Sequence, residues 1–280
     1  MDRLLAAAGG TLDLANYDAL GDLTDAGGGN GTAAITDSAA VAVAGSPFTA
    51  NHVSTGLYRV TLPTSLSTLD VYDVLWTMPD ASLRSTRFEL VGTFLFTIAS
   101  LQAFDAELAN ETTYPPARVR DIRETVEDRF AQCARVSFTR RGMRDYLDGD
   151  STCVLFTSWP QVRRVVSVKV DGVAQDVANV KSYNTGRLEL VSGVFPWGRR
   201  NIEVLYEHGY DPVPSPAAEA GKIYARELIV KGAFDDMARA TSVQTELGLM
   251  RISQAAQGRV GVPEVDAVLA DWGYAGALVG

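Results

Sequence analysis

The stretch 191-VSGVFPWGRRNIEVLYEHGYDP-212 combines a turn, a long apolar-polar repeat and much of the unusual chemistry of this chain. Pro196 and Gly198 supply turn geometry on either side of a tryptophan. From Ile202 onward apolar and polar residues alternate, which is the period of a half-buried strand. The stretch also holds an arginine pair and one of the two histidines of the chain, so it is either an anion or catalytic site or part of the architecture. The alternation favours architecture.

The histidine of this stretch, His208, follows the strand and precedes a turn glycine. The chain contains no G-x-S-x-G nucleophile motif, so we interpret His208 as a strand-end or packing residue. A hydrolase that pairs His208 with Ser192 or Ser215 is the least favoured alternative. No H-E-x-x-H or paired C-x-x-C motif occurs either. We therefore expect no catalytic residues, no metal site and no cofactor.

Several more strands are predicted upstream, in "RVSFTRRG", "TCVLFTSWP", "VRRVVSVKVDGV" and "GRLELVSG". Within the third, alternate valines end at Asp171-Gly172, a pair typical of a two-residue hairpin turn. Trp159 and Trp197 each adjoin a proline or glycine in this strand-and-turn context. Such tryptophans are predicted to anchor the core of a sheet sandwich.

Residues 11–91 contain similar short runs separated by Gly, Asp, Asn and Pro. In "GLYRVTLP", Tyr58, Val60 and Leu62 share one side of a strand, and the residues between them share the other. The regular spacing predicts a small antiparallel sandwich. The glycine-rich segment 25–31 is predicted to be a loop, because it lacks the Lys-Ser/Thr of a phosphate-binding loop.

A helix is predicted after Tyr114-Pro115-Pro116, because apolar residues recur three or four positions apart from Val119 to Cys133. Its other face carries arginine and glutamate, which is either a solvated face or a protein interface. A second helix is predicted from Ser215 to about Ala240. A third begins at Pro263 and carries an apolar stripe of Val265, Val268, Leu269 and Trp272.

The bulk composition is that of a folded protein of 280 residues, a length that favours two domains over one. The net charge of -9 argues against a protein that grips nucleic acid. The charge is uneven: residues 1–92 hold ten acidic residues and four arginines, whereas residues 118–144 hold eight arginines and four acidic residues. Cys133 and Cys153 are not expected to form a disulfide, and reduced, cytosolic folding fits best.

Neither an export signal nor a membrane span is expected. The apolar run at the N-terminus is too short for a signal peptide. The most apolar segment, Leu90 to Phe104, is shorter than the roughly 20 residues that a membrane helix requires.

From about Gly92 to Tyr274 the chain resembles the head-tail connector (adaptor) proteins of tailed bacteriophages, of the actinobacteriophage type. The resemblance depends on segments that occur in a fixed order, not on one diagnostic motif. They are "VGTFLFTIASLQAF", "ARVRDIRETVEDRFAQCARVSFTRRG", "TCVLFTSWPQVRRVVSVKVDG", "GRLELVSGVFPWGRRNIEVLYEHGYDPVP", the helix that follows, and "GRVGVPEVDAVLADW". The acidic N-terminal region lies outside the resemblance.

The resemblance implies a helical-bundle connector core with a β-hairpin or β-sheet insertion. Together with the N-terminal β-sandwich-like domain that the strand spacing predicts, this gives an α+β fold. The expected domains are residues 1–92 (β-rich accessory domain), 93–240 (connector core) and 241–280 (C-terminal docking tail). The implied role is structural, not enzymatic. The protein would form a homo-oligomeric ring, commonly a dodecamer, in the neck of the virion after assembly in the host cytoplasm.

The implied partners are the portal protein above the ring and the next tail-proximal neck protein, a stopper or tail terminator, below it. Double-stranded DNA would pass through without specific binding, and no membrane would be involved. The implied portal contacts are Arg259, Val262, Pro263, Val265, Val268 and Trp272. This assignment assumes that the apolar stripe after Pro263 finds no partner within its own subunit.

The mixed-charge stretch supplies candidates for contacts between subunits, because a ring needs two complementary faces on each copy. These candidates are Arg118, Arg123, Glu127, Arg140, Arg141 and Arg144. The alternative function is a carbohydrate- or host-surface-binding module that uses Trp76 or Trp197, or another structural protein of the tail.

Overall fold

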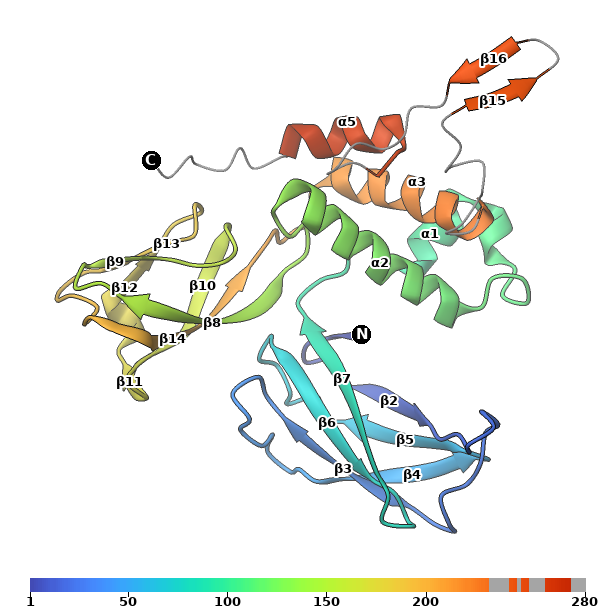
Figure 1. The fold of residues 1–280 in the computed structure, drawn as a ribbon, viewed down its shortest axis with the longest axis horizontal. Coiled ribbons are helices and arrows are strands. Elements are labelled where there is room, and N and C mark those ends of the chain that lie inside the picture. Colours follow the sequence, from blue (N-terminus) through green and yellow to red (C-terminus); the bar gives the residue numbers. More distant parts are fainter. Residues whose placement is uncertain (232–241, 246–247, 252–259, 273–280) are drawn as a thin grey trace.

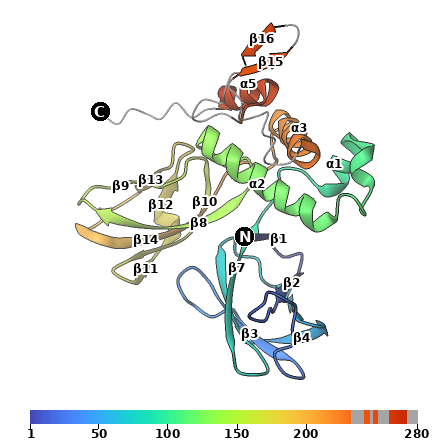
Figure 2. The same cartoon turned by 45° about the vertical axis from the view of Figure 1, so that its right-hand side comes forward.

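A computed structural model describes residues 1–231, 242–245, 248–251 and 260–272. Figure 1 shows three regions: an N-terminal β region (residues 1–91), a β8–β14 region (residues 141–208) and a helical layer above both. The view in Figure 2, turned by 45°, shows the same arrangement.

The N-terminal β region is built from short strands that follow one another along the chain. They are β1 (Asp2–Leu5), β2 (Gly10–Ala15), β3 (Gly31–Thr36), β4 (Phe48–Ser54), β5 (Leu57–Leu62), β6 (Val71–Thr77) and β7 (Leu83–Val91). Their order is β7-β6-β3-β4-β5-β2, and β1 lies parallel to β7. One apolar cluster, which includes Tyr58, Val60 and Trp76, takes residues from both ends of this order. The alternation predicted for "GLYRVTLP" is confirmed, because Tyr58, Val60 and Leu62 are buried.

The β8–β14 region contains the longest strands of the protein. Its elements are β8 (Arg141–Gly149), β9 (Val154–Phe156), β10 (Val162–Val170), β11 (Val173–Gln175), a short 3-10 turn (Val177–Asn179), β12 (Val180–Ser182), β13 (Arg187–Leu190) and β14 (Gly198–His208). Strands β11, β10, β14 and β8 continue the sheet of the N-terminal region, and β12, β13 and β9 form a smaller sheet. The hairpin turn predicted at Asp171-Gly172 is confirmed: Val170 pairs with Val173, and both turn residues have positive φ.

The helical layer comes from two separated parts of the sequence. Its helices are α1 (Ile98–Phe104), with a 3-10 turn after it (Ala106–Ala109), α2 (Pro116–Ala134), α3 (Ser215–Lys231) and α5 (Pro263–Trp272). A two-stranded hairpin of β15 (Ser242–Thr245) and β16 (Gly248–Arg251) lies between α3 and α5 in the sequence. The predicted extension of α3 to Ala240 lies outside the described residues.

The prediction of a helical-bundle core with a β insertion is wrong. The fold is mostly antiparallel β, with an eleven-stranded sheet and a three-stranded sheet beside a single layer of helices. The large sheet passes from one β region to the other where Val91 of β7 pairs with Arg141 of β8. The apolar stripes predicted where the helices lie in the sequence, but they did not predict that the helices form one layer beside a large sheet. Of the strands between α2 and α3, β8 pairs with β7, and β14 and β10 follow β8 in the sheet, so the sheet is the continuous element of the molecule.

The last described helix, α5, packs into its own subunit. Val265 and Leu269 are buried in the apolar cluster of α2 and α3, and the half-buried Val262, Val268 and Trp272 pack against it. The Trp272 ring packs edge-on against the Tyr210 ring, with the ring centres 5.1 Å apart. The assumption that the stripe after Pro263 finds no partner within the subunit is therefore wrong.

The burial of α5 predicts a large cost for truncating its apolar stripe. Leu269→Ala is expected to lower the free energy of unfolding by about 2–5 kcal/mol, because it leaves a cavity between α5 and α2. Urea unfolding followed by circular dichroism measures this cost. Ala270→Ser, on the exposed side of the same helix, is the matched control and is expected to cost less than about 1 kcal/mol. Equal small costs for both would show that α5 does not belong to the core.

Candidate functional site

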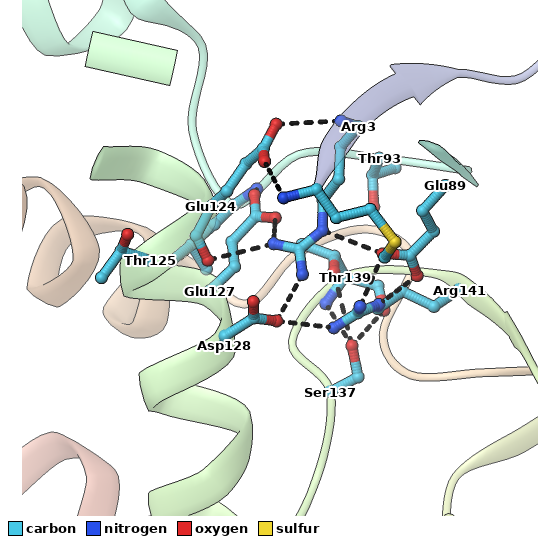
Figure 3. A network of polar contacts seen from close by, with 12 residues as sticks. Arg3, Glu89, Thr93, Glu124, Thr125, Glu127, Asp128, Ser137, Thr139 and Arg141 are labelled. Atoms are coloured by element: carbon cyan, nitrogen blue, oxygen red, sulfur yellow. Dashed lines mark hydrogen bonds and ion pairs between the residues drawn. The ribbon is translucent and has the colours of Figure 1, made fainter. Parts of the chain in front are cut away.

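Charged side chains meet in a partly buried cluster where the two β regions and α2 come together: Arg3, Glu89 and Glu127 are buried, whereas Asp128 reaches the surface. We call this cluster the ionic junction; its members are Arg3, Glu89, Glu124, Glu127, Asp128 and Arg141 (Figure 3). Most of the arginine donors in it have carboxylate or carbonyl partners, so the junction is a network and not a set of isolated pairs.

Arg3 is at the centre of the ionic junction and is almost completely buried. Its guanidinium donates to Glu89 Oε2 at 3.0 Å, to Glu127 Oε2 at 2.9 Å and to the Glu124 carbonyl at 3.1 Å, and it also binds Asp128. Burial alone would lower the pKa of Arg3, but the carboxylates of Glu127, Glu89 and Asp128 outweigh it and raise the pKa. Arg3 therefore stays charged and links β1 to both β7 and α2.

Arg141 brings β8 into the same network. It donates to both oxygens of Glu89, each at 2.6 Å, and to Asp128 Oδ1 at 3.3 Å. Glu89 is thus held between the guanidinium groups of Arg3 and Arg141. This bidentate geometry fixes the orientation of both partners.

Local structure explains why these side chains meet. In the parallel pairing of β1 with β7, Arg3 lies opposite Glu89. Glu124, Glu127 and Asp128 occupy positions i, i+3 and i+4 of α2, so they share one face of the helix. The backbone N–H of Leu95 also donates to Glu127 Oε1 at 2.8 Å. The link between β7 and the helical layer is therefore part of the junction.

A second cluster joins β8 to loops of the N-terminal β region. Arg144 donates to Ser38 Oγ at 2.7 Å, to Asp70 Oδ2 at 3.0 Å and to Asp37 Oδ2 at 3.2 Å, and it binds Glu203 of β14. These contacts fix the β8–β14 region against the N-terminal region from the other side of the β7–β8 link.

Gly142, between the two clusters, allows this close approach. A Cβ atom at this position would lie 1.8 Å from the carbonyl oxygen of Leu69. Any larger side chain would push β8 away from the loop before β6.

The structure places most of the predicted inter-subunit residues inside the subunit. Arg123 and Glu127 are buried, and the Arg123 guanidinium lies 3.5 Å from the centre of the Phe94 ring. Arg140 pairs with Asp211 at 2.9 Å, whereas Arg141 and Arg144 belong to the clusters above. Arg118 is exposed on α2. A role of these residues between subunits stays a prediction.

The predicted portal residues of α5 are spread over several environments. Pro263 is exposed, Val265 is buried, and Val262, Val268 and Trp272 are half-buried. Arg259 lies outside the described residues. Portal contact by this set is also still a prediction.

His208 lies beside the ionic junction at the end of β14. Its ring stacks on Trp159, with the ring centres 5.3 Å apart, and its Nδ1 has no hydrogen-bond partner. It borders a cavity of about 220 Å³ that is also lined by Glu89, Asp128 and Arg141. Burial, with a contribution from the Arg141 charge, lowers the pKa of His208 to about 3. The imidazole is therefore a neutral packing group at pH 7.

The serines considered as partners of His208 belong to other elements of the fold. The Ser192 hydroxyl bonds to Asn179 Oδ1 at 3.2 Å, and Ser215 begins α3. Trp159 is half-buried against His208, but Trp197 is 79% exposed, so the prediction that Trp197 anchors a sandwich is wrong. Trp76 is fully buried and cannot serve as a binding platform.

Within residues 1–231, 242–245, 248–251 and 260–272, no group of three or more His, Cys, Asp or Glu side chains is placed to hold a metal ion. Over the same ranges, no helix is both long and apolar enough to cross a membrane.

The central residues of the junction, Arg3, Glu89 and Asp128, were not predicted as site residues. A signal existed for Glu89, because it interrupts the apolar run "FELV" of β7, where Phe88, Leu90 and Val91 are all buried. A charge inside such a run needs a buried partner. The identity of that partner, 86 residues away in the sequence, required the pairing of β1 with β7.

Comparisons with known proteins add no relative: no protein-family model matches this chain, and no curated protein sequence matches it.

The ionic junction predicts that Arg3 is far more important for stability than an exposed arginine. Arg3→Met is expected to cost about 3–5 kcal/mol of unfolding free energy, because it leaves buried carboxylates without their partner. Arg59→Met is the matched control: Arg59 pairs with Asp13 at the surface of the same β region, and the change is expected to cost far less than Arg3→Met because solvent screens an exposed ion pair. Chemical denaturation measures both. A cost for Arg3→Met no larger than the control would contradict the central role of Arg3.

The low pKa of His208 predicts a defined dependence of stability on pH. As the pH falls below the ordinary histidine pKa of about 6.5, His208 becomes protonated in the unfolded chain. In the folded chain it stays neutral down to about pH 3. The contribution of His208 to stability therefore falls as the pH falls through this window, by up to about 1.4 kcal/mol per pH unit. His208→Gln is expected to make the slope of unfolding free energy against pH shallower by about one proton. An unchanged slope between pH 6 and pH 4 would mean that His208 titrates normally in the folded protein.

Proposed function

We propose that this protein is a structural component of a bacteriophage virion: a head-to-tail connector that forms a ring below the portal and lines the DNA channel. The proposal begins from the ordered sequence segments between Gly92 and Tyr274 that resemble such connectors. The portal protein, a tail-proximal neck protein and further copies of the chain are its proposed partners.

The observation that carries the proposal is the ionic junction. It joins β1, β7, β8 and α2 through paired charges of which Arg3, Glu89 and Glu127 are buried, and the Arg144 cluster adds a second attachment beside it. A connector must hold its contacts with several neighbours in a constant relative position. A subunit whose regions are fixed to one another by buried ion pairs suits that task, because moving one region would expose or separate these charges.

The charge distribution agrees with this role. The chain carries a net charge of -9, and the surplus of acidic residues is concentrated in residues 1–92. A wall with this charge repels the phosphates of DNA and lets the duplex slide past it.

A carbohydrate- or host-surface-binding module is a second candidate. The 79% exposure of Trp197 favours it, since an exposed tryptophan beside polar residues is a common platform for a sugar ring. Binding of the full chain to a glycan array that is lost in Trp197→Ser would support this candidate.

The proposed connector role predicts a portal contact on the exposed side of α5. Removing the C-terminal segment is a poor test, because Val265 and Leu269 belong to the core of the subunit. Ala267 is exposed on α5, and Ala267→Arg is expected to weaken binding to the portal protein of the same virus roughly ten-fold or more. Surface plasmon resonance with immobilised portal measures this affinity.

Ala103→Arg, an equivalent change at an exposed position of α1, is the control and should leave portal affinity unchanged. Electron microscopy of the wild-type chain with portal should show rings on the portal. Particles without rings, together with no measurable portal binding by the wild-type protein, would overturn the connector proposal.

A further inference from the structure

An exposed tryptophan lies at the end of the connection between β13 and β14, and two exposed arginines follow it at the start of β14. We call this surface the Trp197 tip; it comprises Val191, Val194, Trp197, Arg199 and Arg200. Val191 is 58% exposed, Val194 56% and Trp197 79%. Trp and Arg are the residue types that most often dominate the energy of protein–protein interfaces.

The Trp197 tip is held by the residues around it. Phe195 is buried, its N–H donates to the Thr152 carbonyl at 2.7 Å, and its carbonyl accepts from Ser151 at 3.0 Å. The Asn201 side chain donates to the Pro196 carbonyl at 3.0 Å and accepts from Gly149 N–H at 3.0 Å. An ordered loop that presents apolar side chains loses little conformational entropy on binding.

The arginine charges of the tip indicate which kind of partner it would bind. Over the described residues, no carboxylate pairs with the Arg199 guanidinium, and Arg200 lies over the Tyr146 ring at 5.4 Å. The surface is apolar at its centre and carries two arginine charges at one side, where the exposed Asp148 carboxylate accepts from the backbone N–H of Arg200 at 2.6 Å. A complementary partner would be apolar and acidic.

Such a surface exists on the same chain, in the connection between β2 and β3. We call it the Leu20 loop; it comprises Tyr17, Asp18, Leu20, Asp22 and Leu23. All five residues are exposed, and Leu20 is 88% exposed. The carboxylate of Asp22 makes no ion pair with any described residue.

The Leu20 loop is also ordered by internal hydrogen bonds. Asp18 Oδ1 accepts from the backbone N–H groups of Leu20 at 2.8 Å and of Asp22 at 3.0 Å. Tyr17 and Leu23 form an isolated bridge at its base. The loop therefore presents Leu20 and two carboxylates on a defined turn.

We propose that the Trp197 tip of one copy docks on the Leu20 loop of a second copy. The inference rests on the proposed ring-forming function and identifies the surfaces that join neighbouring subunits. The two surfaces lie in different regions of the subunit, the β8–β14 region and the N-terminal β region (Figure 1). A contact between two different surfaces is head-to-tail, and it forms a closed ring when the rotation between neighbouring copies divides a full turn.

Charge reversal tests this contact in the full-length chain. Arg199→Glu and Asp22→Arg are each expected to weaken self-association roughly ten-fold or more, because each places like charges opposite one another. An equimolar mixture of the two variants is expected to recover assembly. When the two variants alternate around the assembly, every contact again joins opposite charges. In one contact the glutamate of Arg199→Glu faces the arginine of Asp22→Arg, and in the next contact the native Arg199 faces the native Asp22. Sedimentation velocity over a concentration series, with and without the portal protein, measures both effects.

Arg163→Glu is the matched control, because Arg163 is an exposed arginine on β10 of the same β region. It should assemble like the wild type. Trp197→Ser and Leu20→Ser remove the apolar part of the contact and should weaken assembly without a change in the circular dichroism spectrum. A partial unfolding of one variant would not produce recovery in the mixture, so recovery supports the contact directly.

The outcomes separate this inference from the connector proposal. If single variants form the same rings as the wild type, or if the mixture fails to recover, the contact is wrong while the connector role stands. If the wild type stays monomeric both alone and with portal, both are wrong. If Trp197→Ser loses glycan binding but assembles normally, the tip binds carbohydrate and the inference is overturned.

Discussion

The shared binding of Glu89 by Arg3 and Arg141 is the constraint on which the arrangement of this protein depends. Glu89 lies on β7, Arg3 on β1 and Arg141 on β8, so one carboxylate joins three strands. Glu127 and Asp128 extend the same network to α2. Buried charges are costly unless they are paired, so a placement of the β regions and the helical layer that separates Arg3 from Glu89 and Glu127 is disfavoured.

This constraint explains how two β regions that are separated in the sequence are held in one arrangement. The N-terminal β region and the β8–β14 region share a sheet, but the backbone link between β7 and β8 is a single residue pair, Val91 with Arg141. Such a link would bend easily by itself. The ionic junction on one side and the Arg144 cluster on the other prevent the bending.

The fixed arrangement of the two β regions also affects the two exposed surfaces of the subunit. The Trp197 tip and the Leu20 loop are both ordered by hydrogen bonds and belong to regions that are fixed relative to one another. Contacts made through them would therefore have a constant geometry from copy to copy, which a closed ring requires. The arginine-rich stretch, in contrast, is used mainly inside the subunit, where Arg140, Arg141 and Arg144 pair with carboxylates of the same chain.

By itself, the sequence determined the local structure of single strands, turns and helices. Alternation predicted the two sides of β5, the Asp171-Gly172 pair predicted a hairpin turn, and spacings of three and four predicted α2, because each pattern depends only on residues close in the sequence. Only the tertiary structure decided that β7 continues into β8, that α5 packs inward and that Arg3 meets Glu89. These outcomes depend on which apolar and charged surfaces are buried together, and the groups concerned lie far apart along the chain. The exposure of Trp197 was decided in the same way, since Phe195, and not Trp197, is the aromatic residue of this turn that is buried in the core.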